Sequence, residues 1–201
     1  MPRRIIVIVL ALVGILPATP AVAGTAVPDT EVEIPELVLV FPQDQAVTRF
    51  RSTFGDPRHN HRHQGNDLFA PKMTPVYAAA DGVVTRIRTS GNAGRYLVVT
   101  HAGGWETWYL HLNNDTPGTD DGAADYRYTY APGIEVGAFV RAGDLIAYVG
   151  DSGNTEDSSP HTHFELRYRG EAVDPYPYLA PAYERAALAA RLAWLATMPL
   201  D

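Results

Sequence analysis

Residues 76–112 read VYAAADGVVTRIRTSGNAGRYLVVTHAGGWETWYLHL, and this stretch decides the fold class. Short runs of β-branched and aromatic residues alternate with turn residues, a pattern typical of strands joined by tight connections. Asp81-Gly82 predicts a tight turn, and Gly103-Gly104 predicts a two-residue hairpin between the flanking strands. The expected strands, which continue beyond this stretch, are 76–80, 82–88, 96–101, 105–112, 145–149 and 161–169.

The spacing of these runs also predicts how the chain is organised. Several short strands at regular intervals favour a mainly β fold, an antiparallel sandwich or open barrel, over alternating strands and helices. An Ala- and Leu-rich segment that starts at Pro181 predicts a closing helix, with the proline in its first turn. We therefore expect an extended lead-in at 24–48, a β domain at 49–180 and a C-terminal helix at 181–201.

Composition and charge narrow the class of protein. With 201 residues, 46% hydrophobic and 19% charged, the chain has the size and composition of one globular domain. The formal net charge of -7 and the scattered basic residues argue against binding to nucleic acid through phosphate neutralisation. Because the chain has no cysteine, it forms no disulfide, and any metal site must use His, Asp or Glu.

The first residues have the features of a secretory signal peptide at 1–23. Arg3 and Arg4 precede an apolar run over 5–16, and the small residues 21–23 form a cleavage site. The run is shorter than the ~20 apolar residues that cross a bilayer, so a retained membrane anchor is the weaker interpretation. We expect a protein secreted into the cell envelope or beyond it, with no stable membrane insertion after cleavage.

The segment 113–137 interrupts the strand pattern. Glycine, proline and threonine surround a group of aspartates, and alternating tyrosines follow. Such dense carboxylates indicate a calcium site or a solvated acidic loop, and the loop is favoured because their spacing does not match the EF-hand pattern. The aspartates are Asp115, Asp120, Asp121 and Asp125, and the tyrosines are Tyr126, Tyr128 and Tyr130.

Histidines carry the chemical signal of this sequence. His63 and Asp67 are close in the chain, and Gly65 between them lets the backbone turn so that imidazole and carboxylate face one ion. His161 and His163 lie two residues apart in an expected strand, where both side chains point to the same face. The other histidines are His59, His61, His101 and His111.

These groups outnumber the ligands that one catalytic metal ion needs. Catalytic zinc takes three protein ligands and keeps one position open, so one histidine of the closely spaced pair is free to act on a water molecule. In the expected strand 105–112, alternation places Tyr109 and His111 on one face as well. The histidines therefore predict a metal site with further imidazoles beside it.

The histidines belong to a set of short motifs spread over about 54–179. The motifs are His63-Gln-Gly-Asn-Asp67, Ala70-Pro71, Thr74-Pro75-Val76, Ala80-Asp81-Gly82-Val83-Val84, Tyr109-Leu-His111-Leu, Val140-Arg-Ala-Gly143-Asp-Leu-Ile146, Val149-Gly150, Gly153-Asn154 and Pro160-His161-Thr-His163-Phe-Glu165. Together, and in this order, they closely resemble the LytM/lysostaphin-type zinc endopeptidases, peptidase family M23.

The resemblance implies a zinc ion bound by His63, Asp67 and His163, with His111 and His161 beside the attacking water. It also implies an antiparallel β sandwich or open barrel of the duplicated hybrid motif type, with a substrate groove. The implied activity is hydrolysis of peptide bonds in peptidoglycan stem peptides or cross-bridges. Peptidoglycan peptides are therefore the expected partner, and a regulatory partner is left open. The acidic segment 113–137 is longer than the connection usual in the family.

The chemistry of imidazole agrees with these implied roles. Zinc lowers the pKa of a water molecule toward neutrality, and a neutral imidazole can take the proton and return it to the leaving amine. Because no HExxH glutamate is present, His161 is the first choice as base, and His111 orients water or stabilises the oxyanion. The residues expected to be exposed or to play supporting roles are His59, His61, His101, Asp81, Glu165 and Asp174.

Three hypotheses follow for the function. The leading one is an exported zinc metalloendopeptidase acting on peptidoglycan. The alternative is a catalytically idle M23-like domain that binds cell wall or activates another cell-wall hydrolase. A third is a metal carrier or structural protein in which zinc has four protein ligands.

Overall fold

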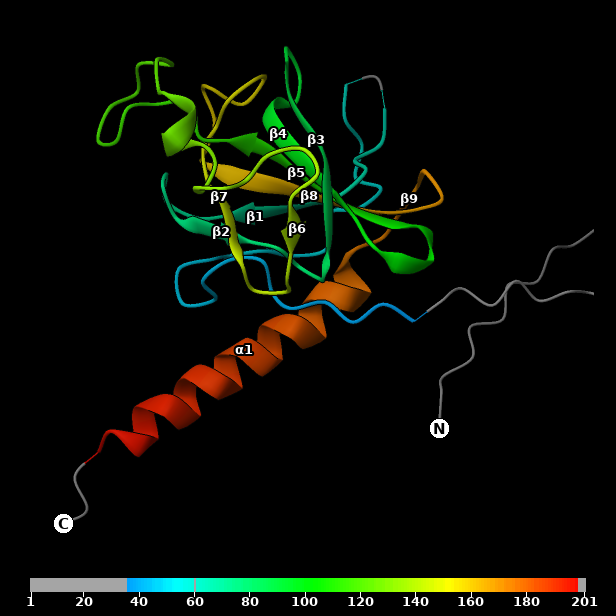
Figure 1. Cartoon of the computed structure of the whole chain (residues 1–201), viewed down its shortest axis with the longest axis vertical. Helices are drawn as coiled ribbons and strands as arrows, with labels where there is room; N and C mark the ends of the chain where they lie inside the picture. The colour runs from blue at the N-terminus through cyan, green and yellow to red at the C-terminus, as the bar shows by residue number, and fades with distance from the viewer. Residues whose placement is uncertain (1–35, 60, 199–201) are drawn as a thin grey trace, which may run out of the picture. The chain divides into compact units, whose positions relative to one another are not determined.

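The structure is a computed structural model that describes residues 36–59 and 61–198 (Figure 1). The signal peptide expected at 1–23 lies outside the described residues. The strands are β1 (Asn66–Phe69), β2 (Pro75–Tyr77), β3 (Gly82–Ser90), β4 (Gly94–Thr100), β5 (Trp105–Leu112), β6 (Phe139–Val140), β7 (Leu145–Tyr148), β8 (His161–Tyr168) and β9 (Glu171–Val173), and the helix is α1 (Tyr176–Ala196).

Most of the strands form one antiparallel sheet, which curls into half a barrel (Figure 1). This sheet has seven strands in the order β1-β8-β5-β4-β3-β6, and β9 also pairs with β8. Strands β2 and β7 form a separate two-stranded sheet. The prediction of a mainly β, antiparallel fold with a C-terminal helix is confirmed.

The connection between β4 and β5 is longer than the two-residue hairpin that the sequence predicts. Residues 102–104 form a 3-10 turn, and His101 N donates a hydrogen bond to Trp105 O at 2.8 Å. Gly103 and Gly104 both have positive φ, which glycine adopts without strain. The sequence does not predict β1, β6 and β9, which have four, two and three residues.

The described part of the lead-in packs against the sheet. Leu39 and Phe41 belong to the hydrophobic core, with exposed fractions of 1% and 6%. Arg49 and Phe69 exchange two backbone hydrogen bonds of 2.9 Å, so the chain here extends the edge of β1. The segment is extended, as expected. Residues before position 49, where we expected the β domain to begin, already pack into its core.

One face of the sheet holds the core, and the opposite face is left for the site. Tyr109 of β5 is fully buried; its ring centroid lies 5.4 Å from that of Phe164 in β8, and its hydroxyl accepts a hydrogen bond from Ala79 N at 2.8 Å. Burial of a side chain such as Phe164 stabilises the fold by about 1.5–3 kcal/mol. Because side chains alternate along a strand, His163 and Glu165 face away from this core.

The C-terminal helix begins earlier than the sequence predicts. Tyr176 starts α1 and donates its N–H to Asp174 Oδ1 at 2.9 Å, whereas Pro181 lies inside the helix. Pro175 and Pro177 fix φ at values that suit the start of a helix, which explains the earlier boundary. None of the described helices is long and apolar enough to cross a membrane. Exposed apolar residues in the second half of α1 are Leu188, Leu192, Trp194 and Leu195.

Candidate functional site

The predicted metal-binding residues lie together where β1 meets β8. Asp67 pairs directly with His163 across the two strands, and His63 lies just before β1. His63 Nε2 is 2.8 Å from His163 Nδ1, and each of these nitrogens is 3.0 Å from Asp67 Oδ1. All three side chains are buried. The structure therefore brings a nitrogen, an oxygen and a second nitrogen into one triangle.

Hydrogen bonds on the outer side of each ring decide which nitrogen faces this triangle. His63 Nδ1 donates to the carbonyl oxygen of Thr53 at 2.8 Å, so its Nε2 presents a lone pair. His163 Nε2 donates to Glu165 Oε1 at 3.2 Å, so its Nδ1 presents a second lone pair. Asp67 Oδ1 is a third acceptor. Three acceptors at this distance repel one another unless a cation lies among them.

Zinc fits this donor set. Imidazole nitrogens and carboxylate oxygens bind zinc at about 2.0–2.1 Å, and tetrahedral angles then place the ligand atoms roughly 3.3 Å apart. The observed edges of 2.8 and 3.0 Å are close to that spacing. Three protein ligands also leave one tetrahedral position for water or substrate. Two groups of side chains among the described residues could hold a metal, and this is the one that offers nitrogen.

Charges around the triangle attract a cation. Burial opposes ionisation of Asp67, but the imidazoles of His163 and His63 hold the pKa of Asp67 well below its usual range. Burial also opposes protonation of His163, but the carboxylates of Asp67 and Glu165 raise the pKa of His163. The buried carboxylates thus stabilise either a proton or a metal ion at the site.

Arg58 is a contact of the site that the sequence analysis did not identify. Its guanidinium donates to Asp67 Oδ2 at 2.8 Å, on the oxygen that lies outside the triangle. The bond leaves Oδ1 of the same carboxylate for the triangle and orients the group. Arg58 belongs to none of the motifs, and it precedes Asp67 by nine residues in an irregular segment, so no pattern marks it.

Gly65 serves the site through its lack of a side chain. Its φ is not positive, so the turning freedom that we predicted for it is not the reason for glycine here. A Cβ at this position would overlap the carbonyl oxygen of Phe164 and lie 2.9 Å from His163 Nε2. Glycine allows the segment that carries His63 and Asp67 to approach β8 closely.

His161 lies beside the triangle on the same face of β8 as His163, as alternation predicts. Its Nδ1 donates to the carbonyl oxygen of Ser159 at 2.8 Å, and its Nε2 lies 3.8 Å from Asp67 Oδ1. Burial lowers the pKa of His161, although Ser159 and Asp67 act in the opposite direction. A neutral His161 therefore presents an unprotonated Nε2 toward the triangle.

His111 reaches this face by a route that the sequence does not predict. Tyr109 pairs with Phe164 on the core side, and regular alternation would place His111 there too. The register between β4 and β5 shifts next to His111, whose φ of 59° is left-handed. The resulting bulge turns the His111 ring to the opposite face of the sheet. The centroids of the His111 and His161 rings are 5.1 Å apart. The prediction that Tyr109 and His111 share a face is therefore wrong.

The His111 ring is held in one orientation. Its Nδ1 donates to the carbonyl oxygen of Ser152 at 2.9 Å, and its centroid lies 6.0 Å from that of His163. Burial lowers the pKa of His111 to about 4, although the bond to Ser152 acts in the opposite direction. The backbone carbonyls that orient His63, His111 and His161 carry no sequence signal, because any residue type supplies one.

The remaining histidines lie outside the site. His59 and His61 are exposed, as predicted. His101 is buried; its Nδ1 is 2.8 Å from Asp81 O, and its Nε2 is 2.8 Å from Thr107 Oγ1. Its contacts join the turn before β3 to β5, which agrees with the structural role expected for it.

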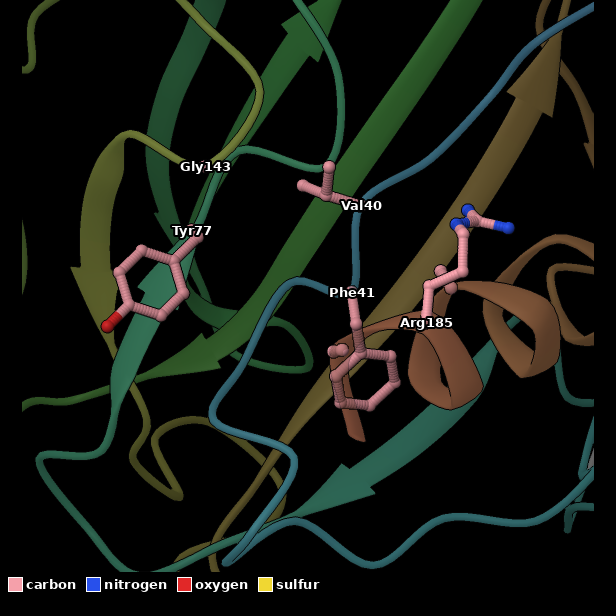
Figure 2. Close-up of a pocket in the computed structure, with 7 residues that line it drawn as sticks. Val40, Phe41, Tyr77, Gly143 and Arg185 are labelled. Carbon is pink, nitrogen blue, oxygen red and sulfur yellow. The ribbon is translucent and has the colours of Figure 1, made fainter. Parts of the chain in front are cut away.

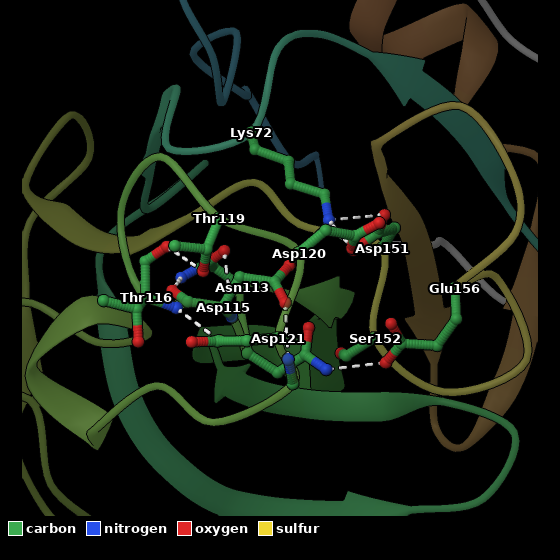
Figure 3. Close-up of polar contacts among 12 residues, drawn as sticks. Lys72, Asn113, Asp115, Thr116, Thr119, Asp120, Asp121, Asp151, Ser152 and Glu156 are labelled. Atoms are coloured by element: carbon green, nitrogen blue, oxygen red, sulfur yellow. Dashed lines mark hydrogen bonds and ion pairs between the residues drawn. The ribbon is translucent and has the colours of Figure 1, made fainter.

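Carboxylates of the acidic segment surround a lysine (Figure 3). Lys72 Nζ lies 2.6 Å from both Asp115 Oδ2 and Asp120 Oδ1. Asp151 Oδ2 lies 2.9 Å from the same nitrogen. The three carboxylates are close enough together to hold a metal ion, but the ammonium group already lies among them. The lysine thus supplies the positive charge that the calcium interpretation assigned to an ion. Asp120, Asp121 and Asp125 are exposed, in agreement with the solvated-loop interpretation, whereas Asp115 is buried.

The two pockets described in the structure contain no histidine. One, of about 340 Å³, lies between the lead-in, β2 and α1 (Figure 2), where Arg185 donates to Leu39 O at 2.8 Å. The other is lined by Ile87 and by eight residues between Tyr126 and Val136. Both are therefore separate from the histidine site. The residues that line the first pocket are Val40, Phe41, Tyr77, Gly143, Ala182, Arg185 and Ala186.

Known proteins resemble this chain in sequence. Residues 61–175 match the family model for peptidase family M23. Over 142 residues the chain is 34% identical to the DD-carboxypeptidase/endopeptidase Mpg of Neisseria meningitidis, covering 68% of this chain and 28% of that protein. Over 141 residues it is 31% identical to the peptidoglycan DD-endopeptidase ShyB of Vibrio cholerae, covering 67% and 28%. The chain thus spans only 28% of the length of these relatives.

Solved structures resemble it in fold as well. A zinc-containing peptidase from Vibrio cholerae matches with a TM-score of 0.56 at 30% identity, over 69% of this chain and 39% of that one. The catalytic domain of the antimicrobial peptidase lysostaphin from Staphylococcus simulans matches with a TM-score of 0.54 at 25% identity, over 69% and 98%. The family model covers more than half of the residues, so the chain belongs to peptidase family M23.

Proposed function

We propose that this protein is a zinc-dependent endopeptidase that hydrolyses peptide bonds in bacterial peptidoglycan. The observation that carries the proposal is the triangle of acceptor atoms from His63, Asp67 and His163, with two further imidazoles beside it. Membership of family M23 and the names of the relatives support the reaction and the substrate class.

His63, Asp67 and His163 would hold the zinc ion. When bound, zinc polarises the scissile carbonyl and lowers the pKa of a water molecule toward neutrality. The outer hydrogen bonds to Thr53 and Glu165 keep the two imidazoles turned with their lone pairs inward. The protein thereby presents its ligands before the metal arrives.

His161 is the proposed general base. Its Nδ1 proton is held by the carbonyl oxygen of Ser159, so Nε2 is the nitrogen free to accept a proton. Because burial lowers its pKa, the ring is neutral near pH 7. His161 Nε2 would take a proton from the attacking water and return it to the leaving amine.

His111 is the proposed water-orienting residue. Its Nδ1 proton is held by Ser152, and with a pKa of about 4 the ring is neutral near pH 7. A neutral ring in this orientation presents an Nε2 lone pair, which accepts a hydrogen bond from water and has no proton to donate to an oxyanion. This observation favours orientation of water over the other role that the sequence left open.

We further propose that the bond cleaved is a DD peptide bond of the cross-link and that the protein acts outside the cytoplasm. Support for the bond comes from the relatives named as DD-endopeptidases. Support for the location comes from the signal-like features of residues 1–23 and from the position of peptidoglycan outside the cytoplasmic membrane.

The test is incubation of the zinc-loaded protein with defined peptides, one set joined by DD cross-links and one by glycine bridges, with product masses as readout. We expect the wild type to split the DD cross-link. His161→Ala should keep one zinc per chain and lose turnover by about 10²-fold or more.

Other outcomes would contradict specific parts of the proposal. A zinc-loaded wild type that cleaves neither set supports the idle-domain alternative. Cleavage of the glycine bridge alone refutes the DD assignment and keeps the peptidase. Loss of zinc in His161→Ala indicates a site with four protein ligands.

A further inference from the structure

Lys72 contacts carboxylates from two segments of the chain, at Asp115 and at Asp151 (Figure 3). Asp115 follows His111 closely in the chain, and Asp151 immediately precedes Ser152, whose carbonyl oxygen accepts the hydrogen bond from His111 Nδ1. Lys72 Nζ lies 2.6 Å from Asp115 Oδ2 and 2.9 Å from Asp151 Oδ2. One ammonium group thus links the chain that leaves His111 to the segment that orients its ring.

Both contacts are shielded from water. The side chains of Asp115 and Asp151 are 2% and 4% exposed, and that of Lys72 is 22% exposed. Burial opposes the charge on Lys72, but its hydrogen bonds to the carboxylates raise the pKa of Lys72 above its usual value. Charge-assisted hydrogen bonds of this kind are stronger than neutral ones. The third carboxylate, that of Asp120, is 73% exposed and is expected to add little.

Further hydrogen bonds hold Ser152, the residue after Asp151, against β4 and β5. Ser152 Oγ donates to Leu112 O at 2.7 Å and accepts from Arg95 N at 2.9 Å. Thr155 Oγ1 donates to Asp151 O at 2.7 Å. Asp151 Oδ1 is buried without a hydrogen-bond partner, so the Lys72 contact at Oδ2 anchors this carboxylate. The Ser152 carbonyl is therefore fixed through a side chain on one side and through β5 on the other.

His111 has a conformation that needs such support. Its φ of 59° is rare for a residue with a side chain, and it follows the bulge that turns the ring away from the core. A strained residue of this kind keeps its geometry only where the surroundings hold it. The hydrogen bond from Nδ1 to the carbonyl oxygen of Ser152 orients the ring, so whatever fixes Ser152 also fixes His111.

We propose that Lys72 is a positioning residue which acts through Asp151 and Ser152 to hold the His111 ring with Nε2 toward the metal-binding residues. Asp115, which belongs to the acidic segment, helps to hold Lys72 in place through its own contact with Nζ. The inference rests on the proposed function for the role of His111 in turnover, whereas the orientation of the ring can be measured without it.

The test compares Asp151→Asn with Asp120→Asn. Each variant removes one carboxylate charge from Lys72, but Asp151 is joined to Ser152 and Asp120 is exposed. The variants are made in the wild type and in His111→Ala. The readouts are kcat, KM, zinc content, and the long-range 1H–15N signals that report which nitrogen of His111 carries the proton.

We expect Asp151→Asn to lower kcat by about 10- to 100-fold, with KM and zinc content unchanged, because a small misplacement of a reacting group has effects of this size. The single Nδ1-protonated signal of His111 should shift or average, and in His111→Ala the same change should have no further effect on kcat. Asp120→Asn should have the same kcat, KM and zinc content as the protein in which it is made. Lys72→Met should reproduce Asp151→Asn, and Lys72→Arg should restore most of the turnover.

Two results would overturn the inference. One is an unchanged His111 signal in a folded Asp151→Asn protein, and the other is an equal loss of kcat with and without His111. If the zinc-loaded wild type cleaves no peptidoglycan peptide, the proposed function fails, and the His111 signal still decides whether Lys72 positions the ring.

Discussion

His111 Nδ1 lies 2.9 Å from the carbonyl oxygen of Ser152, a bond between β5 and a loop 41 residues further along the chain. A carbonyl oxygen can only accept, so this bond places the proton on Nδ1 and the lone pair on Nε2. Thr53 and Ser159 act on His63 and His161 in the same way. Backbone carbonyls of residues outside the motifs thus determine the protonated nitrogen of the site imidazoles.

Replacing His111 by alanine should reduce turnover and leave the metal in place. His111 is not one of the three triangle residues, so zinc content should match the wild type. We expect kcat to fall by about 10²–10⁴-fold, the range for loss of a residue that assists proton transfer. The exposed His59→Ala variant is the matched control. Loss of zinc in His111→Ala would show that His111 is a ligand.

Replacing Glu165 by glutamine should weaken zinc binding. Glu165 accepts from His163 Nε2 at 3.2 Å and from Arg167 Nε at 2.7 Å, so its charge supports the ligand ring. We expect an increase of about 10- to 100-fold in the zinc dissociation constant, measured by competition with a chelator. Glu171→Gln on the exposed end of β9 should leave affinity unchanged. Equal zinc dissociation constants in the two variants would show that Glu165 does not support zinc binding.

Replacing Gly65 by alanine should disturb the site through sterics. The added methyl group would overlap the Phe164 carbonyl and press on the His163 ring, so β1 and β8 would have to separate locally. We expect lower zinc affinity and a lower melting temperature. Gly91→Ala is the control, because no atom lies within 4 Å of its Cβ position and its φ is not positive. Normal zinc binding in a stable Gly65→Ala protein would contradict the claim that residue 65 lies too close to β8 for a side chain.

Acid should destabilise the fold in part through His101. Burial lowers the pKa of His101 below the ordinary histidine value of about 6.5, so the unfolded chain binds this proton more readily than the folded chain. Stability therefore shows no dependence on His101 above about pH 6.5 and falls below it, by at most about 1.4 kcal/mol per pH unit for one proton. Urea unfolding at pH 7.5 and 5.5 should show a smaller loss in His101→Gln. Identical losses would exclude His101 as the source.

Part of the site could be predicted because it depends on local geometry. His161 and His163 share a face since side chains alternate along any strand, and the motif around His63 and Asp67 indicates a shared ion. The strands of 76–112 were predictable for a similar reason, because turn residues bound runs of β-branched and aromatic side chains.

The rest depends on contacts between distant parts of the chain. The bulge at His111 exists because β4 and β5 pair out of step, which alternation within one strand does not reveal. Lys72 meets Asp115 and Asp151 from positions 43 or more residues away. The early start of α1 depends on Pro175 and Pro177 and on the hydrogen bond from Tyr176 N to Asp174, whereas the sequence pattern favours a start at Pro181.

The central claim is that His63, Asp67 and His163 form the zinc site, and anomalous diffraction at the zinc edge tests it most directly. In a crystal of the zinc-loaded protein we predict one strong peak about 2.0–2.2 Å from His63 Nε2, Asp67 Oδ1 and His163 Nδ1. A peak among Asp115, Asp120 and Asp151 instead, or no peak at the histidines, would contradict the account.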